Sequence, residues 1–145
     1  MTDSLHIVCP HCRTTNRVRR DDLAQAPDCG SCHKALFVAH SLALDETSFD
    51  RHISRSQIPV LVDFWAPWCA PCRQMAPAFE QAAAQLEPRV RLVKVDTEAN
   101  QALGARFNIR SIPTLALFLN GREIARQAGA MGAADIVRWT QAQLP

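Results

Sequence analysis

The chain lacks long hydrophobic runs, internal repeats and an excess of charge of either sign. A membrane-spanning helix needs about 20 consecutive apolar residues, and no run in this sequence approaches that length. The 16 Lys and Arg residues against 14 Asp and Glu residues give a net charge of +2, whereas nucleic acids and anionic membranes attract clustered basic residues. We therefore expect neither a nucleic acid nor a membrane as a partner.

A secretory signal is also missing from the N-terminus, which reads MTDSLHIVCPHC. This segment has no basic region followed by an apolar stretch, so we expect a cytoplasmic protein. With 48% hydrophobic and 21% charged residues, the composition is that of a folded protein. Its 145 residues suit one full domain with a small appendage.

What the sequence does contain is cysteine in pairs. Its six cysteines form three C-x-x-C motifs, namely Cys9/Cys12, Cys29/Cys32 and Cys69/Cys72. In a reducing compartment, paired thiols are more often metal ligands or redox catalysts than structural disulfides. The surroundings of each pair therefore decide which role it takes.

Four of the cysteines and most of the histidines lie within residues 1–40, which contain few large apolar residues. A segment of about 40 residues cannot bury enough apolar surface to fold alone, so a metal or a disulfide is usually needed. We predict a small zinc-ribbon-like domain over residues 1–40 that is held together by a metal.

Residues 41–145 show the alternation of strands and helices that is typical of an α/β domain. The pattern predicts strands at 60–65, 90–95, 114–119 and 122–127, and helices at 45–57, 69–86, 99–107 and 132–144. Asn120-Gly121 is a strong hairpin signal between the last two strands. We therefore predict a central mixed sheet with helices on both of its faces.

The first two cysteine pairs have the spacing of a zinc site. The interval between Cys12 and Cys29 falls within the about 15 to 20 residues of C-x₂-C-x₁₅₋₂₀-C-x₂-C motifs. Two such turns supply four thiolates at tetrahedral angles around one ion. We therefore predict a structural zinc bound by Cys9, Cys12, Cys29 and Cys32.

Other interpretations of these pairs are possible. Four thiolates accept iron as well as zinc, and His11 or His33 could replace one thiolate. The tetrapeptide Cys9-Pro10-His11-Cys12 also resembles the active site of periplasmic disulfide oxidases. Neither a strand rich in β-branched residues before it nor an amphipathic helix after it is evident from the sequence, so we interpret that match as coincidence.

The third pair follows a predicted buried strand and begins a predicted helix. A lone C-x-x-C with no second pair nearby cannot complete a four-ligand metal site. Unpaired amides and a partial positive charge at the N-terminus of the helix stabilise a thiolate at Cys69. We predict Cys69 as the attacking thiol and Cys72, one turn further along the helix, as the resolving thiol.

The segment VDFWAPWCAPC at residues 62–72 resembles the active-site segment of the thioredoxin family. Ser111-Ile112-Pro113-Thr114 is similar to the family's cis-proline loop, and Asn120-Gly121 is similar to its hairpin turn. With its four-cysteine extension, the chain resembles the zinc-binding thioredoxins of the thioredoxin-2 type. The family usually has Gly-Pro between the two cysteines, so Ala70-Pro71 here implies a modestly shifted reduction potential.

The resemblance implies roles for further residues. Asp63 would be buried with a raised pKa and would exchange a proton with Cys72, unless it lies at the edge of its strand and faces water. Lys94 would pair with Asp63 or stay exposed on its strand. Pro113 would be cis and would present the backbone of Ile112 to an extended substrate. An apolar rim would dock partner proteins, and its members would be Trp68, Ile112, Gly129 and Ala130.

The resemblance also implies a protein-disulfide reductase that serves cell redox homeostasis. Its targets would be disulfide-containing proteins, and a flavin-dependent thioredoxin reductase would recycle it with NADPH. Its cofactor would be a structural zinc, with no organic cofactor bound. Two other functions are compatible with the residues: a disulfide oxidant or isomerase, which would need an export signal, and a zinc-dependent redox-sensing or chaperone-like binding module.

Overall fold

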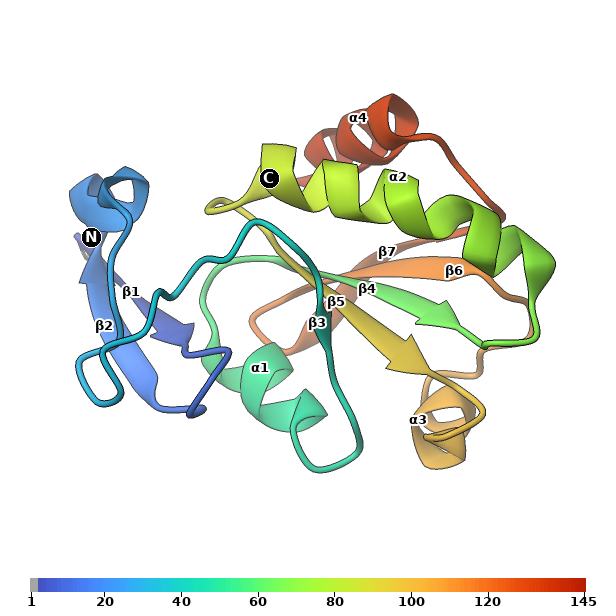
Figure 1. Ribbon diagram of the computed structural model, residues 1–145, viewed down its shortest axis with the longest axis horizontal. Coiled ribbons are helices and arrows are strands. Elements are labelled where there is room, and N and C mark those ends of the chain that lie inside the picture. The colour runs from blue at the N-terminus through green and yellow to red at the C-terminus, as the bar shows by residue number, and fades with distance from the viewer. Residues whose placement is uncertain (1–2) are drawn as a thin grey trace.

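The computed structural model describes residues 3–145 and consists of a small N-terminal ribbon (residues 3–40) beside a larger body (residues 41–145) (Figure 1). The ribbon contains two antiparallel strands, β1 (Ser4–Val8) and β2 (Thr15–Arg19), followed by a 3-10 helix, η1 (Arg20–Gln25). Neither strand is evident from the sequence pattern, because each is only five residues long and carries polar residues.

A small hydrophobic core holds the two strands of the ribbon together. Leu5 and Ile7 of β1 face this core because side chains two apart lie on the same side of a strand. Cys9 and Cys29 are part of the same cluster, and Ile58 of the body completes it. The ribbon therefore buries its apolar side chains partly against the body.

The body contains a five-stranded sheet in the order β3 (Leu42–Ala43), β5 (Arg91–Asp96), β4 (Val60–Trp65), β6 (Thr114–Leu119) and β7 (Arg122–Ala128). β3 and β4 pair with β5 in parallel, whereas β6 and β7 run antiparallel to their neighbours. Five of the six residues of β4 are buried, as expected of a central strand with parallel pairing. The predicted mixed sheet is confirmed.

Four helices cover the two faces of the sheet, namely α1 (Phe49–Arg55), α2 (Ala70–Leu86), α3 (Gln101–Arg106) and α4 (Ala133–Gln143). In Figure 1, α2 and α4 lie above the sheet and α1 and α3 lie below it. Successive side chains of β4 point to opposite faces. Val62 and Phe64 pack in the cluster that contains residues of α1 and α3, whereas Leu61 packs with those of α2 and α4.

Every element predicted for the body is present, with its ends shifted by a few residues. The largest shift is at α1, which begins at Phe49 rather than at residue 45. Asp45 Oδ1 accepts hydrogen bonds from the amides of Thr47 and Ser48, and this side chain to backbone bonding holds the segment as a turn. The short strand β3 lies outside the predicted pattern.

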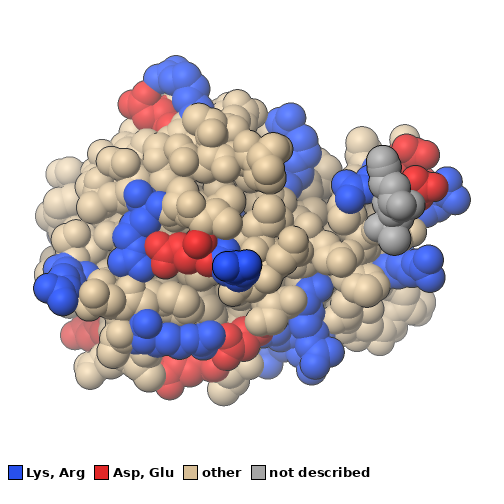
Figure 2. Space-filling view, turned by 180° about the vertical axis from the view of Figure 1, so that it is seen from behind, with Lys and Arg blue, Asp and Glu red and all other residues tan. Residues whose placement is uncertain are grey.

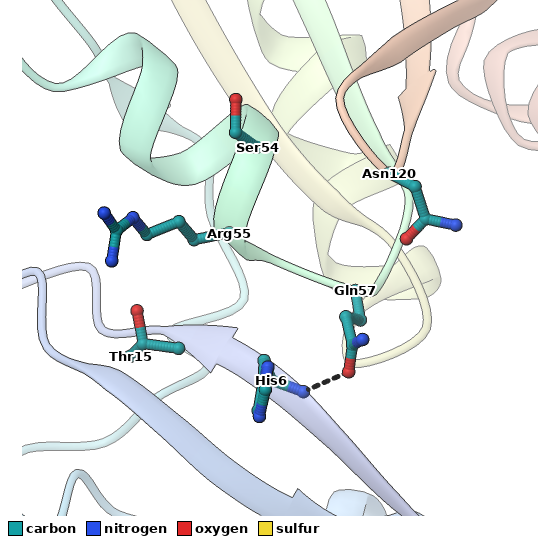
Figure 3. A pocket seen from close by; sticks show the side chains of 6 residues that line it. All are labelled: His6, Thr15, Ser54, Arg55, Gln57 and Asn120. Atoms are coloured by element: carbon teal, nitrogen blue, oxygen red, sulfur yellow. Dashed lines mark hydrogen bonds between the residues drawn. The ribbon is translucent and has the colours of Figure 1, made fainter. Parts of the chain in front are cut away.

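Hydrogen bonds along α1 and the residues after it join the ribbon to the body. Gln57 exchanges two bonds of 2.8 Å with the backbone of His6 in β1, and the Val8 amide donates to Ser56 Oγ at 3.2 Å. A polar hollow of about 400 Å³ opens beside these contacts (Figure 3). Its lining residues come from both parts, namely His6, Thr15, Ser54, Arg55, Gln57 and Asn120.

Charged side chains of both signs are interspersed on the face of the molecule seen in Figure 2. This distribution agrees with the net charge of +2. Among the helices of residues 3–145, none combines the length and the apolarity that crossing a membrane requires.

Candidate active site and metal centre

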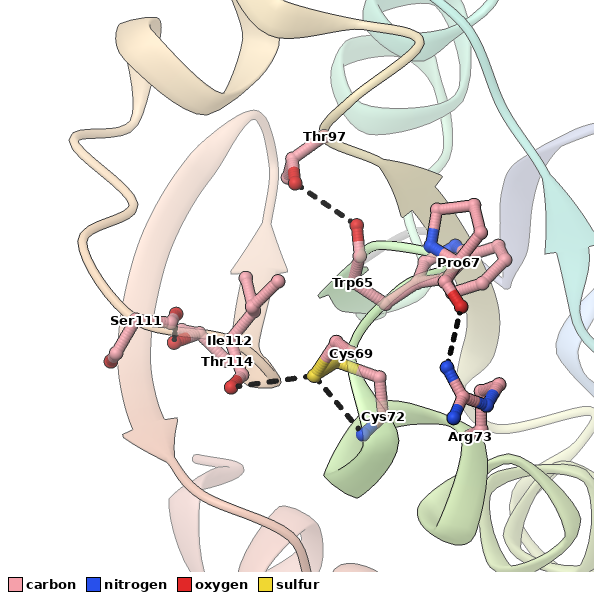
Figure 4. The surroundings of a disulfide bond; sticks show 9 residues. All are labelled: Trp65, Pro67, Cys69, Cys72, Arg73, Thr97, Ser111, Ile112 and Thr114. Atoms are coloured by element: carbon pink, nitrogen blue, oxygen red, sulfur yellow. Dashed lines mark hydrogen bonds between the residues drawn. A yellow bond between two sulfur atoms is a disulfide. The ribbon is translucent and has the colours of Figure 1, made fainter.

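Cys69 and Cys72 form a disulfide where β4 passes into α2 (Figure 4), with their Cα atoms 5.2 Å apart. Cys69 is the N-cap residue of α2, and its sulfur accepts a hydrogen bond of 3.2 Å from the amide of Cys72. Once the disulfide is reduced, this amide and the helix dipole stabilise a thiolate at Cys69. Cys72 is the more deeply buried of the two, at 1% exposed against 5%, and so has the surroundings of a resolving thiol.

Three hydrogen bonds, donated by Thr97 and Arg73, hold the loop that leads into the disulfide (Figure 4). Thr97 donates to the carbonyl oxygen of Trp65 through its amide at 2.8 Å and through Oγ1 at 3.0 Å. Arg73 donates from Nη1 to the carbonyl oxygen of Pro67 at 2.8 Å. The sequence pattern singles out neither residue, although the position of Arg73 directly after Cys72 is a signal that could have found it.

The loop before β6 lies against the disulfide. The peptide bond between Ile112 and Pro113 is cis, as predicted, and the carbonyl oxygen of Ile112 lies 3.8 Å from Cys69 Sγ. The carbonyl oxygen of Pro113 accepts a hydrogen bond of 2.9 Å from the amide of Gly129. This loop therefore places a backbone carbonyl oxygen beside the sulfur of Cys69.

Two apolar side chains and two small exposed residues belong to the predicted rim. Trp68 is 66% exposed, and the half-buried Ile112 packs against Cys69 and Cys72. Gly129 and Ala130 are exposed. Gly129 has a φ of 100°, a backbone conformation that favours glycine. A hollow of about 210 Å³ lies between Trp68 and Ile112, and Thr97 and Arg110 are among its other lining residues.

Asp63 lies in β4 and is 0% exposed. Neither of its carboxylate oxygens has a hydrogen-bond partner among residues 3–145. Burial raises the pKa of Asp63 to about 7, although the ammonium of Lys94 opposes this shift and the charge of Glu80 adds to it. The alternative of an aspartate facing water at the edge of its strand is therefore wrong. A carboxyl group that titrates near neutral pH can exchange a proton with a thiol.

Lys94 is the register partner of Asp63 between the parallel strands β5 and β4. It is half-buried, and its Nζ lies 4.4 Å from the centroid of the Trp65 ring, within the range of a cation–π interaction. Lys94 is thus not a fully exposed strand lysine. Its positive charge acts on Asp63 while its ammonium packs on the aromatic ring.

The four cysteines of the ribbon converge on one point. Their sulfur atoms all lie within 4.8 Å of one another, with 3.7 Å between those of Cys9 and Cys32 and 3.6 Å between those of Cys12 and Cys29. Four sulfurs about 2.3 Å from a tetrahedral Zn²⁺ lie about 3.8 Å apart, so the spacing fits this ion. The cluster consists of cysteines alone, and neither predicted histidine alternative is part of it.

Amide groups point at these sulfurs. The amide of His11 donates to Cys9 Sγ and that of Ser31 donates to Cys29 Sγ, both at 3.3 Å. Asn16 also donates to Cys29 Sγ, at 3.4 Å. A hydrogen bond from the backbone of Cys32, and then that from Asn16, lower the pKa of the Cys29 thiol to about 6 against the opposing effect of burial. Against a hydrogen bond from the backbone of Lys34, however, burial and the neighbouring thiols raise the pKa of Cys32 to about 11, so it is the convergence of the four sulfurs rather than their pKa values that supports a metal site.

The surroundings of Cys9-Pro10-His11-Cys12 differ in part from the prediction. β1 ends at Val8, directly before the motif, so a strand that the sequence pattern does not reveal precedes it, although only Ile7 and Val8 of that strand are β-branched. The motif is followed by a turn and then by β2 rather than by a helix. It therefore lacks the helix N-terminus that stabilises a catalytic thiolate at Cys69.

Comparison with protein families identifies both parts of the chain. Residues 40–142 match the family model described as Thioredoxin. Residues 8–34 match the zinc-ribbon model described as Thioredoxin 2, N-terminal. The second match covers all four cysteines of the ribbon cluster.

Individual relatives agree with these matches. Thioredoxin C-3 of Corynebacterium nephridii is 48% identical over 138 residues, which cover 95% of this chain and 94% of that protein. Thioredoxin of Haemophilus influenzae is 43% identical over 90 residues, or 62% of this chain and 84% of that protein. Thioredoxin 1 of Synechococcus elongatus is 44% identical over 61% of this chain and 83% of its own length. The chain therefore belongs to the thioredoxin family of protein-disulfide reductases.

Proposed function

We propose that this protein is a cytoplasmic reductant of protein disulfides that works through Cys69 and Cys72. The observation that carries the proposal is the disulfide at the N-terminus of α2, with the carbonyl oxygen of Ile112 3.8 Å from Cys69 Sγ. A target segment that pairs with the backbone at Ile112 would bring its own disulfide to this sulfur.

The reaction transfers two electrons from the dithiol to the target. The Cys69 thiolate attacks one sulfur of the target disulfide, and the other target sulfur leaves as a thiolate. Cys72 then gives its proton to Asp63 and attacks Cys69 Sγ, so that the second target sulfur is released and both target sulfurs take up protons. The Cys69–Cys72 disulfide remains. Asp63 suits this task because its pKa of about 7 lets it accept and return a proton near neutral pH.

The exposed residues around the disulfide would receive the target. Trp68 offers the largest exposed apolar surface among them, at 66% exposed, and exposed apolar patches of this kind mark interaction sites. Ile112, Gly129 and Ala130 would complete the rim. Pro113 would hold the Ile112 backbone in place, since its carbonyl oxygen is bonded to the amide of Gly129.

Continued turnover needs an electron donor that reduces the Cys69–Cys72 disulfide again. A flavin-dependent thioredoxin reductase with NADPH would fill this role, as the membership of the family implies. The dithiol itself carries both electrons, so the reaction requires no organic cofactor bound to the chain.

We further propose that residues 1–40 form a zinc-binding domain and residues 41–145 the thioredoxin domain. Cys9, Cys12, Cys29 and Cys32 would hold the metal, because their sulfur atoms lie at tetrahedral spacings and accept amide hydrogen bonds. A closed zinc site with four thiolates supplies structural stability rather than redox chemistry. Reductase activity would therefore reside in the thioredoxin domain alone.

The trapping of mixed disulfides tests the roles of the two thiols. With a disulfide-containing protein, Cys72→Ser should accumulate a covalent complex through Cys69, because the resolving thiol is missing. Cys69→Ser should form no complex and should lower NADPH-coupled turnover by at least about 1000-fold. Mass spectrometry of the non-reduced complex identifies the bonded cysteine. Covalent capture by Cys72 in the Cys69→Ser variant would show that the roles are reversed.

A further inference from the structure

Arg91, the first residue of β5, carries a fully buried positive charge. Its side chain is 0% exposed, and its Nη1 lies 3.1 Å from Oε2 of Glu87, whose side chain is 4% exposed. Both residues belong to the body. Burial of an ion pair has a desolvation cost that further hydrogen bonds must offset. The other hydrogen-bond partners of Arg91 and Glu87 therefore indicate which contacts the pair stabilises.

These remaining partners lie in the ribbon. Nη2 of Arg91 donates to the carbonyl oxygen of Leu36 at 2.7 Å and to that of Val8 at 3.4 Å. Oε1 of Glu87 accepts a hydrogen bond of 2.7 Å from the amide of Ala39. The ion pair of the body thus binds the ribbon backbone both where the chain enters the first cysteine pair and after it leaves the second.

The same guanidinium binds the backbone of residues that adjoin or pack against the cysteines of the ribbon. Val8 directly precedes Cys9, and Leu36 packs with Cys9 and Cys29 in the core of the ribbon. Burial lowers the pKa of Arg91, whereas Glu87 and the charge at Cys9 raise it. Four thiolates around Zn²⁺ carry a net charge of −2, and a buried cation beside them stabilises that charge more strongly than a solvated one.

We propose that Arg91 is a positioning residue of the metal centre, supplied by the body, which fixes the backbone around the cysteine pairs and offsets the negative charge of the zinc–thiolate cluster. This inference rests on the zinc site proposed above. Because one guanidinium binds both parts of the chain, zinc binding and the docking of the ribbon on the body are linked through Arg91.

Zinc release from the full-length, zinc-loaded protein tests the role of Arg91. Zinc content is measured first by mass spectrometry, and zinc transfer to the chelating dye 4-(2-pyridylazo)resorcinol is then followed. Arg91→Met should hold zinc about 10- to 100-fold less tightly, the loss of affinity typical when a residue that supports metal ligands is removed, and should therefore transfer zinc to the dye faster. Arg106→Met is the matched control, since it removes an exposed guanidinium paired with Asp50 at 2.9 Å, and it should release zinc at the wild-type rate.

Two further variants distinguish the effect of the positive charge of Arg91 on zinc retention from the effect of its hydrogen bonds to the ribbon. Arg91→Lys keeps the cation and should restore part of the zinc retention that Arg91→Met loses, and it serves if Arg91→Met does not fold. Glu87→Gln leaves the positive charge of Arg91 in place and keeps an acceptor for the amide of Ala39. It should hold zinc at least as tightly as wild type even though its thermal unfolding midpoint falls.

The results distinguish this inference from the zinc site on which it rests. A wild-type protein without bound zinc would overturn the metal site itself. A zinc-loaded wild type beside a folded Arg91→Met variant that keeps zinc equally well would overturn the role of Arg91 alone. So would a Glu87→Gln variant that loses zinc as fast as Arg91→Met.

Discussion

The cysteine pairs of the ribbon and the pair of the body share one spacing but have different surroundings. In the ribbon, two C-x-x-C turns face each other, so that each sulfur lies close to three others. In the body, Cys69 and Cys72 lie alone at the start of a 17-residue helix and against the loop of Pro113. The surrounding fold, rather than the tetrapeptide, therefore decides whether such a pair holds a metal or transfers electrons.

The two regions also differ in what stabilises them. The sheet of the body has a large hydrophobic cluster on each face. The ribbon has one smaller cluster, which includes two of its cysteines and is completed by Ile58 of the body. Small domains with so little core depend on metals or disulfides. Loss of the metal should therefore affect the ribbon far more than the body.

Removal of one metal ligand tests this difference, and we expect the largest effect here. Cys12 is exposed, so Cys12→Ser changes the metal site with little change in packing. Structural zinc contributes about 10 to 16 kcal/mol to the folding of small metal-dependent domains. Hydrogen exchange should show that amides of β1 and β2 lose protection, whereas those of β4 and β6 keep it and disulfide reduction continues. Protected β1 amides in the zinc-free variant would contradict the comparison.

Replacement of Asp63, the buried carboxyl group of the body, should change the free energy of unfolding in a way that depends on pH. The pKa of Asp63 is about 7 in the folded protein against 3.8 for a free aspartate. Between pH 3.8 and pH 7 the carboxyl group is ionised in the unfolded chain but protonated in the folded protein. Asp63 therefore destabilises the folded protein, and this destabilisation increases as the pH rises from 3.8 to 7. At 1.36 kcal/mol per pKa unit, Asp63→Asn should stabilise the oxidised protein by about 2 kcal/mol at pH 5 and about 4 kcal/mol at pH 8.

Urea unfolding at the two pH values measures this gain. Asp45→Asn is a suitable control, because hydrogen bonds from Thr47 and Ser48 lower the pKa of the exposed Asp45 to about 2. That carboxylate contributes stability above pH 3.8, so its removal should destabilise the protein at pH 8. An equal gain from Asp63→Asn at pH 5 and pH 8 would mean that Asp63 is ionised in the folded protein across this range.

His52 of α1 should have a smaller effect on stability, with the opposite dependence on pH. It is 1% exposed, and burial together with the charges of Arg91, Arg13 and Arg51 lowers its pKa to about 4 from 6.5. Below pH 6.5 the imidazole of His52 binds a proton in the unfolded chain but stays neutral in the folded protein. The free energy of unfolding therefore falls as the pH drops toward 4. Between pH 7.5 and pH 5, His52 should account for a loss of about 2 kcal/mol.

The variant His52→Leu isolates this loss, since leucine does not titrate. The difference in unfolding free energy between wild type and variant should shift by that amount when urea titrations at the two pH values are compared. A difference that does not depend on pH would show that the pKa of His52 is the same in the folded and in the unfolded protein.

The sequence predicts the parts of the molecule that depend on local pattern. The apolar run of β4, the helix that begins at Cys69 and the Asn120-Gly121 hairpin are read directly from neighbouring residues. The metal site follows from the spacing of its cysteines. Burial of Asp63 is implied by the resemblance to the thioredoxin family, because the apolar strand around it leaves an aspartate that faces water still open.

Other features depend on contacts between distant residues and are not visible in the sequence. β1 and β2 alternate too briefly to stand out, and they are stabilised by packing against Ile58. Arg91 resembles an ordinary charged residue at the start of a strand, yet it binds the carbonyl oxygens of Leu36 and Val8, 55 and 83 residues away in sequence. Thr97 supports the loop at Trp65 for a similar reason, since the end of β5 meets that of β4 only in the folded sheet.

The reduction potential of the Cys69–Cys72 pair in the zinc-loaded protein is the most direct test of the proposed direction of electron flow. Fluorescence of Trp65 and Trp68 should report the redox state of the pair in thiol–disulfide buffers. We expect a value near about −270 mV, as for thioredoxin itself, which suits a reductant recycled by NADPH. A value near about −120 mV, typical of a strong disulfide donor, would contradict the proposal and reverse the direction of electron flow.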